Sequence, residues 1–345
     1  MKLKTFAVLL CNLAAVVAAV SCTMSPAQAQ AQQMTKLRVG AYESISDAPL
    51  YIALEKHYFA EQGLDVTIES INTGASMMTE LASGDLDASG GSPGAGVYNA
   101  VRQGIQFKIV ADKGRSSPGH GYFAFVVRSD LTGQIKTPAD LRGRVLALTG
   151  WGNGPSSEVT LHRLLAPAGV KESEVHLVNM NFGDIAAGLG TKNVEVGVLI
   201  EPLASQVASK GIATIWKRVD DIYPNQQYGA LMYGPNLIKR PDVARRFMVA
   251  YLKAARYYND ALDNKIPRDE LVAILVKHTS VKNPAVYKNM VYPGVDPNGK
   301  LNEAGMAQDV QEWVEAGRMK QSVKLSDVVD TSYIDYAAKT LGPYR

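Results

Sequence analysis

In the first part of the chain, segments with the two-residue hydrophobic period of strands alternate with segments that have the 3.6-residue period of helices. Short runs at 36–42, 64–71 and 107–112 have the pattern of β-strands. The segment 48–63 places apolar side chains at helical spacing and ends at Gly63. Such a rhythm of strands and helices predicts an α/β fold with a mainly parallel sheet that carries helices on both faces.

The same rhythm restarts with a strand pattern at 144–150, and from about residue 239 the pattern becomes mostly helical. The segment 241–262 is amphipathic, with Phe247 and Tyr251 on its apolar face. We therefore predict two lobes with parallel sheets, joined by two crossing strands, and a helical C-terminal tail. The predicted lobe boundaries are 37–128 plus 229–345 for the first lobe and 129–228 for the second.

The N-terminus has the pattern of a secretory signal peptide over residues 1–29. A basic start, MKLK, precedes an apolar run of 15 residues and then Ala-x-Ala sites. We expect cleavage near Ala29 and a mature protein in the periplasm. The alternative is a lipoprotein anchored through Cys22, because the preceding residues loosely resemble a lipobox.

Charge and cysteine content exclude several classes of function. The chain has 36 Lys and Arg against 33 Asp and Glu, a net charge of +3, and loses Lys2 and Lys4 with the signal peptide. A nearly neutral chain has no charge field for nucleic acid or for a membrane surface. Cleavage also removes both cysteines, and the five histidines are scattered without a zinc-binding spacing. We expect no metal, no cofactor and no nucleic-acid partner.

The stretch GGSPG at 90–94 matches the nucleophile elbow of serine hydrolases, G-x-S-x-G. In that elbow the residue after the serine supplies an N–H to the oxyanion hole, but here it is Pro93, which has none. Ser92 is also a good helix N-cap, with Pro93 at the first helical position. We therefore expect a binding turn or a helix cap and no catalytic residue. An exported serine hydrolase that uses Ser92 remains the alternative from another class.

The run 46–94 resembles the periplasmic solute-binding proteins of ABC importers. It carries a Pro-led helix, the ending FAEQGLDV, a glycine turn and then LASGDLD. The nearest branch is the one for nitrate, sulfonates, taurine and thiamine pyrimidine precursors (SsuA/THI5-like). The segment 194–205 resembles the matching element of the second lobe, and the likeness covers roughly 37–240.

This resemblance implies a bilobal periplasmic binding protein type II fold, monomeric, that closes over one small-molecule ligand. It implies delivery of that ligand to an ABC permease in the inner membrane that is driven by a cytoplasmic ATPase. The implied ligand contacts lie in loops after strands, first in one lobe and then in the other: Tyr42, Ser46, Asp47, Thr73, Gly74, Ala75, Gly91, Ser92 and Lys113; Trp151, Asn153, Ser156, Asn181, Phe182 and Glu201.

Several of these residues also have a purely structural interpretation. Ser46 and Asp47 suit a cap for the helix after Pro49, and Glu201 suits a bond to backbone. Trp151 stands alone among glycines, which favours a ligand platform over a core position.

Helix N-termini and nearby basic residues favour an anionic group on the ligand, and the aromatic residues favour a flat body. An aromatic carboxylate or sulfonate is therefore the favoured ligand, and a pyrimidine or thiamine precursor is the alternative.

Overall fold

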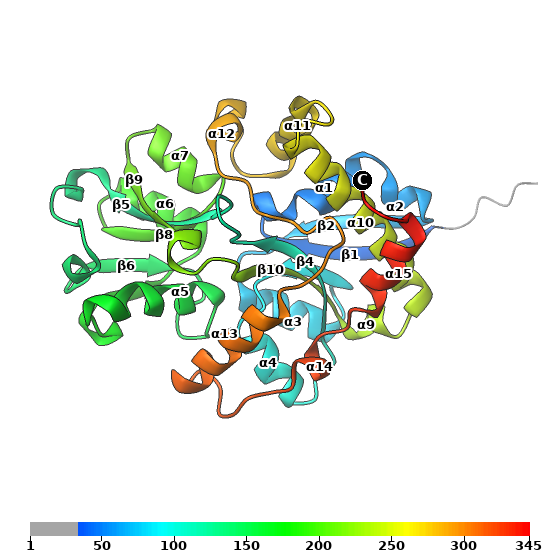
Figure 1. Ribbon diagram of the computed structural model, residues 1–345, viewed down its shortest axis with the longest axis horizontal. Helices are drawn as coiled ribbons and strands as arrows, with labels where there is room; N and C mark the ends of the chain where they lie inside the picture. The colour runs from blue at the N-terminus through cyan, green and yellow to red at the C-terminus, as the bar shows by residue number, and fades with distance from the viewer. Residues whose placement is uncertain (1–33) are drawn as a thin grey trace, which may run out of the picture. The chain divides into compact units, whose positions relative to one another are not determined.

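The computed structural model describes residues 34–345, which Figure 1 shows as coloured ribbon. The predicted signal peptide 1–29, the cleavage site near Ala29 and the lipidation alternative at Cys22 lie outside the described residues. None of the helices between residues 34 and 345 combines the length and the apolar character needed to cross a membrane.

The first sheet has the strand order β2-β1-β3-β10-β4. Strands β1 and β2 are parallel in full register, from Thr35 opposite Leu64 to Ala41 opposite Ser70, and β3 continues this parallel arrangement. Strand β10 runs antiparallel to both β3 and β4. The bounds of the strands are β1 (Thr35–Ala41), β2 (Leu64–Ser70), β3 (Ala88–Gly91), β4 (Lys108–Arg115) and β10 (Gln227–Tyr233).

The second sheet repeats this plan with the order β7-β6-β8-β5-β9. Strands β6, β7 and β8 are parallel, and β5 runs antiparallel to both β8 and β9. The bounds are β5 (Phe123–Arg128), β6 (Val145–Leu148), β7 (His176–Asn179), β8 (Val196–Ile200) and β9 (Ala213–Arg218).

The prediction of two α/β lobes is confirmed, whereas the sheets are mixed and not purely parallel. The antiparallel strands are those that follow a crossing: β5 comes after β4 of the first sheet, and β10 comes after β9 of the second. Because the carboxyl ends of β4 and β9 lie at the junction of the lobes, a strand that starts at this junction must run against its parallel neighbours. For the same reason β5, at 123–128, lies in the second sheet, although the predicted boundary assigned it to the first lobe.

Helices of the first lobe follow its strands and begin at the junction of the lobes. The segment predicted as one helix over 48–63 is interrupted, because His57 adopts a left-handed conformation with φ 58°. Thr73 caps the next helix, its Oγ1 accepting from the N–H of Ser76 at 3.1 Å. The bounds are η2 (Ile45–Asp47), α1 (Ala48–Glu55), α2 (Tyr58–Glu61), α3 (Gly74–Ser83) and α4 (Ala95–Arg102).

The second lobe follows the same pattern, with Asn181 as the cap of α6: its Oδ1 accepts from the N–H of Asp184 at 2.9 Å. Its α-helices are α5 (Ser156–Leu165), α6 (Phe182–Gly190), α7 (Leu203–Ser209) and α8 (Val219–Ile222). Short 3₁₀ turns connect the elements: η3 (Ser129–Leu131), η4 (Pro138–Leu141), η5 (Ala166–Ala168) and η6 (Glu172–Glu174).

The C-terminal tail is helical, as predicted, and packs against both lobes. Its long helix α10 buries Phe247 and Tyr251 against the first lobe, where it packs on α1 and α15. Helix α13 packs Trp313 on Tyr98 of α4, with ring centroids 5.6 Å apart, and also contacts α5 of the second lobe (Figure 1, orange). The bounds are α9 (Pro235–Ile238), α10 (Pro241–Leu262), α11 (Arg268–His278), α12 (Pro284–Asn289), α13 (Glu303–Glu315), α14 (Leu325–Val328) and α15 (Ser332–Leu341).

Candidate functional site

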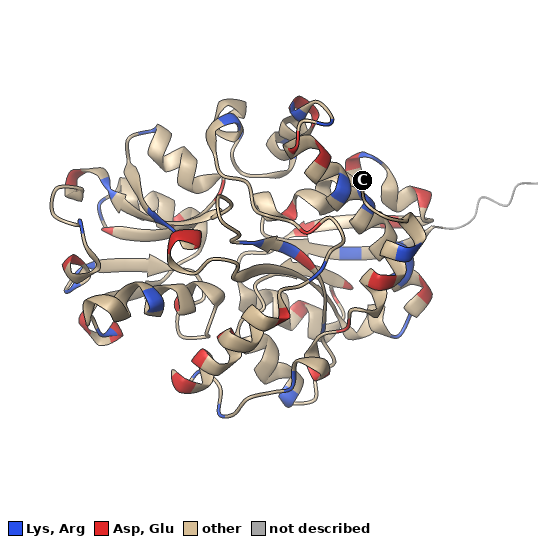
Figure 2. Ribbon diagram, viewed as in Figure 1, with Lys and Arg blue, Asp and Glu red and all other residues tan. Residues whose placement is uncertain are grey.

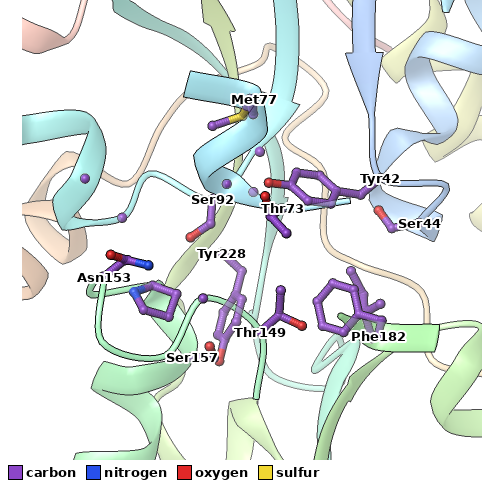
Figure 3. A pocket seen from close by; sticks show the side chains of 18 of the residues that line it. Tyr42, Ser44, Thr73, Met77, Ser92, Thr149, Asn153, Ser157, Phe182 and Tyr228 are labelled. Atoms are coloured by element: carbon purple, nitrogen blue, oxygen red, sulfur yellow. The ribbon is translucent and has the colours of Figure 1, made fainter. Parts of the chain in front are cut away.

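A cavity of about 470 Å³ lies between the two sheets, where the carboxyl ends of their parallel strands meet. Both lobes supply its wall, and Figure 3 shows part of this lining. Its position agrees with the rule that ligands of α/β sheets bind beyond the carboxyl ends of strands. The lining residues are Tyr42, Ser44, Ser46, Thr73, Gly74, Ala75, Met77, Met78, Gly91, Ser92, Gly94, Gly96, Val97, Lys113, Tyr122, Phe123, Thr149, Gly150, Asn153, Gly154, Pro155, Ser157, Asn179, Phe182, Ile200, Tyr228 and Gly229.

Aromatic rings form much of the cavity wall. Phe123 and Tyr228 stand with ring centroids 4.1 Å apart, and Phe182 meets Phe123 edge-on at 5.9 Å. In Figure 3 Tyr42 projects from the first lobe, with Phe182 and Tyr228 on the opposite side. Flat faces on both sides of a cavity favour a ligand with a flat body.

Helix N-termini from both lobes point hydrogen-bond donors at the cavity. The first turns of α3, α4, α5 and α6 contribute lining residues. Each of these helices has at least eight residues, enough for its N-terminal end to carry a partial positive charge. Within residues 34–345 the structure records no hydrogen bond from the backbone N–H of Gly74, Ala75, Gly96 or Ser157. These donors are therefore open to acceptor groups of a ligand.

A buried ion pair lies at the first-lobe side of the cavity. The ammonium of Lys113, on β4, donates to Asp47 Oδ1 at 2.5 Å and to Ser46 Oγ at 2.9 Å, and the side chains of Lys113 and Asp47 are 3% and 0% exposed. The other carboxylate oxygen of Asp47 accepts from the N–H of Tyr42 and from both the N–H and the hydroxyl of Ser44. Asp47 thus organises the loop after β1 and neutralises Lys113.

The two lobes touch beside the cavity. Ser92 and Ser156 share a hydrogen bond of 2.9 Å between their hydroxyls, and the N–H of Ala95 donates to the carbonyl oxygen of Gly154 at 2.8 Å. A Cβ on Gly94 would stand 2.7 Å from this same oxygen, so the approach requires glycine there.

A second set of contacts ties the tail to the second lobe, and we call it the seam: Arg318, Glu158, Glu172, Arg163 and Glu312. Arg318, just after α13, pairs with the buried Glu158 and with Glu172 at 3.3 Å. Arg163 donates to Glu312 at 2.7 Å. The backbone of Arg318 accepts from Asn99 of α4, so the seam joins the first lobe to the second through the tail.

Glu158, His162 and Glu172 stand close enough to hold a metal ion, with their ligand atoms within 4.8 Å of one another. The guanidinium of Arg318 already pairs with both carboxylates of this group. The positive charge that the cluster requires is thus supplied by the protein, and the cluster is a structural ion-pair network.

Two buried carboxylates lie near the crossing segments that join the lobes, and we call this region the hinge. Each carboxylate accepts a hydrogen bond from one of two consecutive glutamines. Gln226 donates to Asp309, on α13, at 3.3 Å, and Gln227 donates to Asp112, on β4, at 2.6 Å. Burial raises the pKa of Asp309 to about 7 and that of Asp112 to about 6. Both groups therefore titrate near neutral pH in the folded protein.

Of the residues expected to contact ligand, ten line the cavity. Among them, Tyr42 and Phe182 are aromatic and Lys113 is charged. The ten are Tyr42, Ser46, Thr73, Gly74, Ala75, Gly91, Ser92, Lys113, Asn153 and Phe182. Ser92 is not a helix N-cap, which corrects that expectation: α4 begins at Ala95 with Gly94 as its cap, and Ser92 bonds to Ser156 instead.

The remaining expected residues lie outside the cavity wall, each with a structural partner. Trp151 is not among the residues that line the cavity, and the guanidinium of Arg318, a seam residue, lies over its ring at 4.9 Å. Glu201 is buried, binds Arg218 and Ser205, and has a pKa raised by its burial. Asp47 binds Lys113, Ser156 bonds to Ser92, and Asn181 caps α6.

Asn181 also borders a second cavity of about 540 Å³, which shares Tyr42, Phe182 and Ile200 with the first. Residues of both lobes line it, and several of them are exposed, including Asn72 and Lys210.

The strands that follow the crossings supply aromatic residues that the sequence analysis did not single out. Tyr122 and Phe123 stand at the start of β5, and Tyr228 stands at the start of β10. The available signal was the proline-containing segment that precedes each strand, SSPGHG before β5 and YPNQ before β10. Ser44, two residues before the expected Ser46, was also missed, as was Ser157 next to Ser156.

Comparison with known proteins places this geometry in a family. A family model described as NMT1/THI5 like matches residues 45–261. YtlA of Bacillus subtilis, whose name describes a binding protein, is 27% identical over 66% of this chain and 67% of its own length. The riboflavin-binding protein RibY of Chloroflexus aurantiacus is 26% identical over 66% of this chain and 62% of its own length. The chain thus matches about two thirds of the length of these relatives.

Solved structures share the fold at low sequence identity. The aliphatic sulphonate binding protein SsuA of Escherichia coli has a TM-score of 0.66 at 20% identity, over 86% of this chain and 92% of that one. The nitrate-binding protein NrtA of Synechocystis PCC 6803 has a TM-score of 0.73 at 15% identity, over 90% and 89%. The desulfurization enzyme DSZB has a TM-score of 0.64 at 14% identity, over 89% and 100%. The predicted periplasmic-binding-protein fold is thereby confirmed.

Proposed function

Because the chain belongs to the NMT1/THI5-like family, we propose that it is the solute-binding component of an ABC import system. It captures one small organic molecule between its lobes and delivers it to a permease in the inner membrane, which a cytoplasmic ATPase drives. The observation that carries this proposal is the cavity itself, lined by both lobes with aromatic faces and unused backbone donors.

The named relatives support this proposal. YtlA and RibY are named as binding proteins, and SsuA and NrtA are periplasmic binding proteins of the same fold. Contacts between Ser92 and Ser156 and between Ala95 and Gly154 join the lobes beside the cavity, as enclosure of a ligand requires. A protein that encloses its ligand between two lobes must open to release it, which suits a delivery role.

The chemistry of the cavity favours binding without turnover. Ser92 has Pro93 after it and shares its hydroxyl with Ser156, and no histidine is among the described residues that line the cavity. A serine nucleophile requires an adjacent general base. The fold alone does not decide this point, because DSZB is an enzyme. Purified protein that hydrolyses esters, with the activity lost in Ser92→Ala, would support the hydrolase alternative.

The ligand is a small organic molecule with a flat body and hydrogen-bond acceptors. Tyr42, Phe182 and Tyr228 offer flat faces, and the N–H groups of Gly74 and Gly96 offer donors. An aromatic carboxylate or sulfonate meets this description, and so does a pyrimidine or thiamine precursor. The name of RibY, which binds riboflavin, adds a flat heterocycle to the compounds to be tried.

The protein acts in the periplasm as a monomer. The proposed location rests on the signal-peptide pattern of residues 1–29, and the proposed monomer rests on the resemblance to solute-binding proteins. N-terminal sequencing of the exported protein is expected to begin just after Ala29. A blocked N-terminus at a lipidated Cys22 would leave the binding role intact and replace a free protein by an anchored one.

Thermal unfolding across a compound library tests the binding role. A ligand that binds only the folded state stabilises it by RT ln(1 + [L]/Kd), about 2.7 kcal/mol at a hundredfold excess over Kd. We expect stabilisation by flat, acceptor-bearing compounds, with one molecule bound per chain and recovered unchanged. A library of such compounds that leaves the unfolding temperature unchanged would contradict the proposal.

A further inference from the structure

The electrostatics of the cavity wall narrow the class of ligand. We infer that the cavity selects a flat, acceptor-bearing molecule that carries no negative charge, and that Asp47 is the residue that sets this preference. The inference rests on the proposed binding function and decides between the two ligand classes named above.

Lys113 is the only basic residue among the described residues that line the cavity. Its ammonium is already paired with Asp47 at 2.5 Å, and both side chains are almost fully buried. A ligand anion at this position would bring a second negative group to an ammonium that already has one, in a region from which water is excluded. Like charges in such a low-dielectric region repel strongly.

Asp47 cannot readily turn away to release Lys113 for a ligand. Its second carboxylate oxygen accepts from the N–H of Tyr42 at 3.0 Å, and from the N–H and hydroxyl of Ser44 at 3.1 and 2.9 Å. The same loop contacts the second lobe, where the N–H of Ile45 donates to the carbonyl oxygen of Glu201 at 3.3 Å. Movement of Asp47 would therefore undo the loop and this contact between the lobes.

Helix N-termini alone would favour an anion, but the second-lobe ends already have acidic groups. Glu158 lies in the first turn of α5, and Asp184 lies in the first turn of α6. Acidic side chains at these positions compensate the positive end of a helix. The first N–H of α5, on Ser156, also donates to Ser92 Oγ at 3.3 Å.

Two arginines at the junction of the lobes are also paired with carboxylates. Arg218 pairs with Glu201 at 3.2 Å, and Arg318 pairs with Glu158 and Glu172. The donors left for a ligand are therefore N–H groups of the first turns of α3, α4 and α5, together with the hydroxyls of Tyr42 and Ser157, which line the cavity without a recorded hydrogen bond to residues 34–345. Such donors suit the carbonyl oxygens and ring nitrogens of an uncharged heteroaromatic molecule or an aromatic amide.

The test compares matched pairs of compounds that differ in charge at one group. Nicotinamide is paired with nicotinate, uracil with orotate, and benzenesulfonamide with benzenesulfonate. Thermal unfolding and titration calorimetry of the wild-type protein give the Kd of each. We expect the neutral member to bind at least tenfold more tightly in every pair for which binding is detected.

The substitution Asp47→Asn tests the role assigned to this residue. It keeps the size of the side chain and leaves the charge of Lys113 without a partner, so we expect nicotinate, orotate or benzenesulfonate to gain at least tenfold in affinity. Asp263→Asn, at an exposed acid far along the tail, is the matched control and is expected to change nothing. Circular dichroism establishes whether the Asp47→Asn protein is folded; if it is not, the wild-type pairs decide alone.

The outcomes separate this inference from the function on which it rests. Tighter binding of the anionic members to the wild-type protein would overturn the inference and leave the binding role standing. The same holds if the folded Asp47→Asn protein gains no affinity for them. Absence of binding by all members of both classes would count against the inference and the proposed function together.

Discussion

The cavity wall and the seam use charge in opposite ways. At the wall, Lys113 pairs with Asp47, which lies just behind it in the same lobe. At the seam, Arg318 and Glu312 of the tail pair with Glu158, Glu172 and Arg163 of the second lobe. Figure 2 shows other charged residues spread over the outer helices and loops. Charge therefore holds the lobes together at the seam, while rings and N–H donors remain for the ligand.

The largest effect is expected when the buried pair of Asp47 and Lys113 is broken. Asp47→Ala leaves the buried ammonium of Lys113 without its carboxylate and removes the acceptor for three donors of the 42–44 loop. Loss of one partner of a buried pair costs about 3–5 kcal/mol in the free energy of unfolding. Urea unfolding at pH 7 measures this change, and a loss below about 1 kcal/mol would show that the pair is not the anchor of the loop.

The contrast between these two regions also explains what the sequence could predict. Strand and helix patterns are local, so they indicated the two lobes and the loops around Tyr42, Thr73 and Asn153. Contacts between distant segments leave no local pattern, so the sequence did not predict that Arg318 of the tail lies over the ring of Trp151. Phe123 and Tyr228 were missed because the junction of the lobes brings two separate crossings together.

The hinge gives a stability that depends on pH. Burial raises the pKa of Asp309 to about 7 and that of Asp112 to about 6, above the usual value of 3.8. The folded state thus binds protons more tightly than the unfolded state, and stability falls as pH rises from about 4 to 7 at about 1.4 kcal/mol for each unit of pKa difference.

Unfolding temperatures between pH 4 and pH 8 measure this dependence. Asp309→Asn keeps an acceptor for Gln226 and is expected to lower the loss of stability between pH 5 and pH 7. An identical pH profile in the variant and the wild type would show that Asp309 is not responsible.

Phe182, which lines the cavity, and Trp151, which contacts Arg318 of the seam, should differ in their effect on ligand affinity. Phe182→Ala removes a face of the cavity and is expected to weaken binding by about 2 kcal/mol, roughly thirtyfold in Kd. Trp151→Ala removes only a contact to Arg318, so its effect on Kd should stay within about fivefold, roughly 1 kcal/mol. Titration calorimetry with one bound compound measures both values of Kd. An equal or larger effect of Trp151→Ala would show that Trp151 contacts the ligand.

The smallest effect is expected at the outer part of the seam. Glu312→Gln removes the charge that faces Arg163, but both side chains are partly exposed and Arg163 still lies over the ring of Tyr223 at 3.4 Å. A partly exposed pair contributes about 0.5–1 kcal/mol to the free energy of unfolding. Urea unfolding of this variant beside Asp47→Ala compares the two regions directly, and equal losses would remove the distinction between them.

The binding site between the lobes is tested most directly by a substitution that fills the cavity. Gly96 lines it, and a Cβ there meets no atom within 4 Å, so the side chain of Gly96→Phe starts without a clash and is expected to occupy the cavity. Gly133 lies outside the cavity and is equally open, which makes Gly133→Phe the matched control. Native mass spectrometry with a compound from the thermal screen counts bound molecules and gives their mass. We predict one unchanged molecule per chain in the wild type and in Gly133→Phe, and none in Gly96→Phe. Binding that survives in Gly96→Phe would contradict a binding site between the lobes, and a chemically altered molecule would contradict binding without turnover.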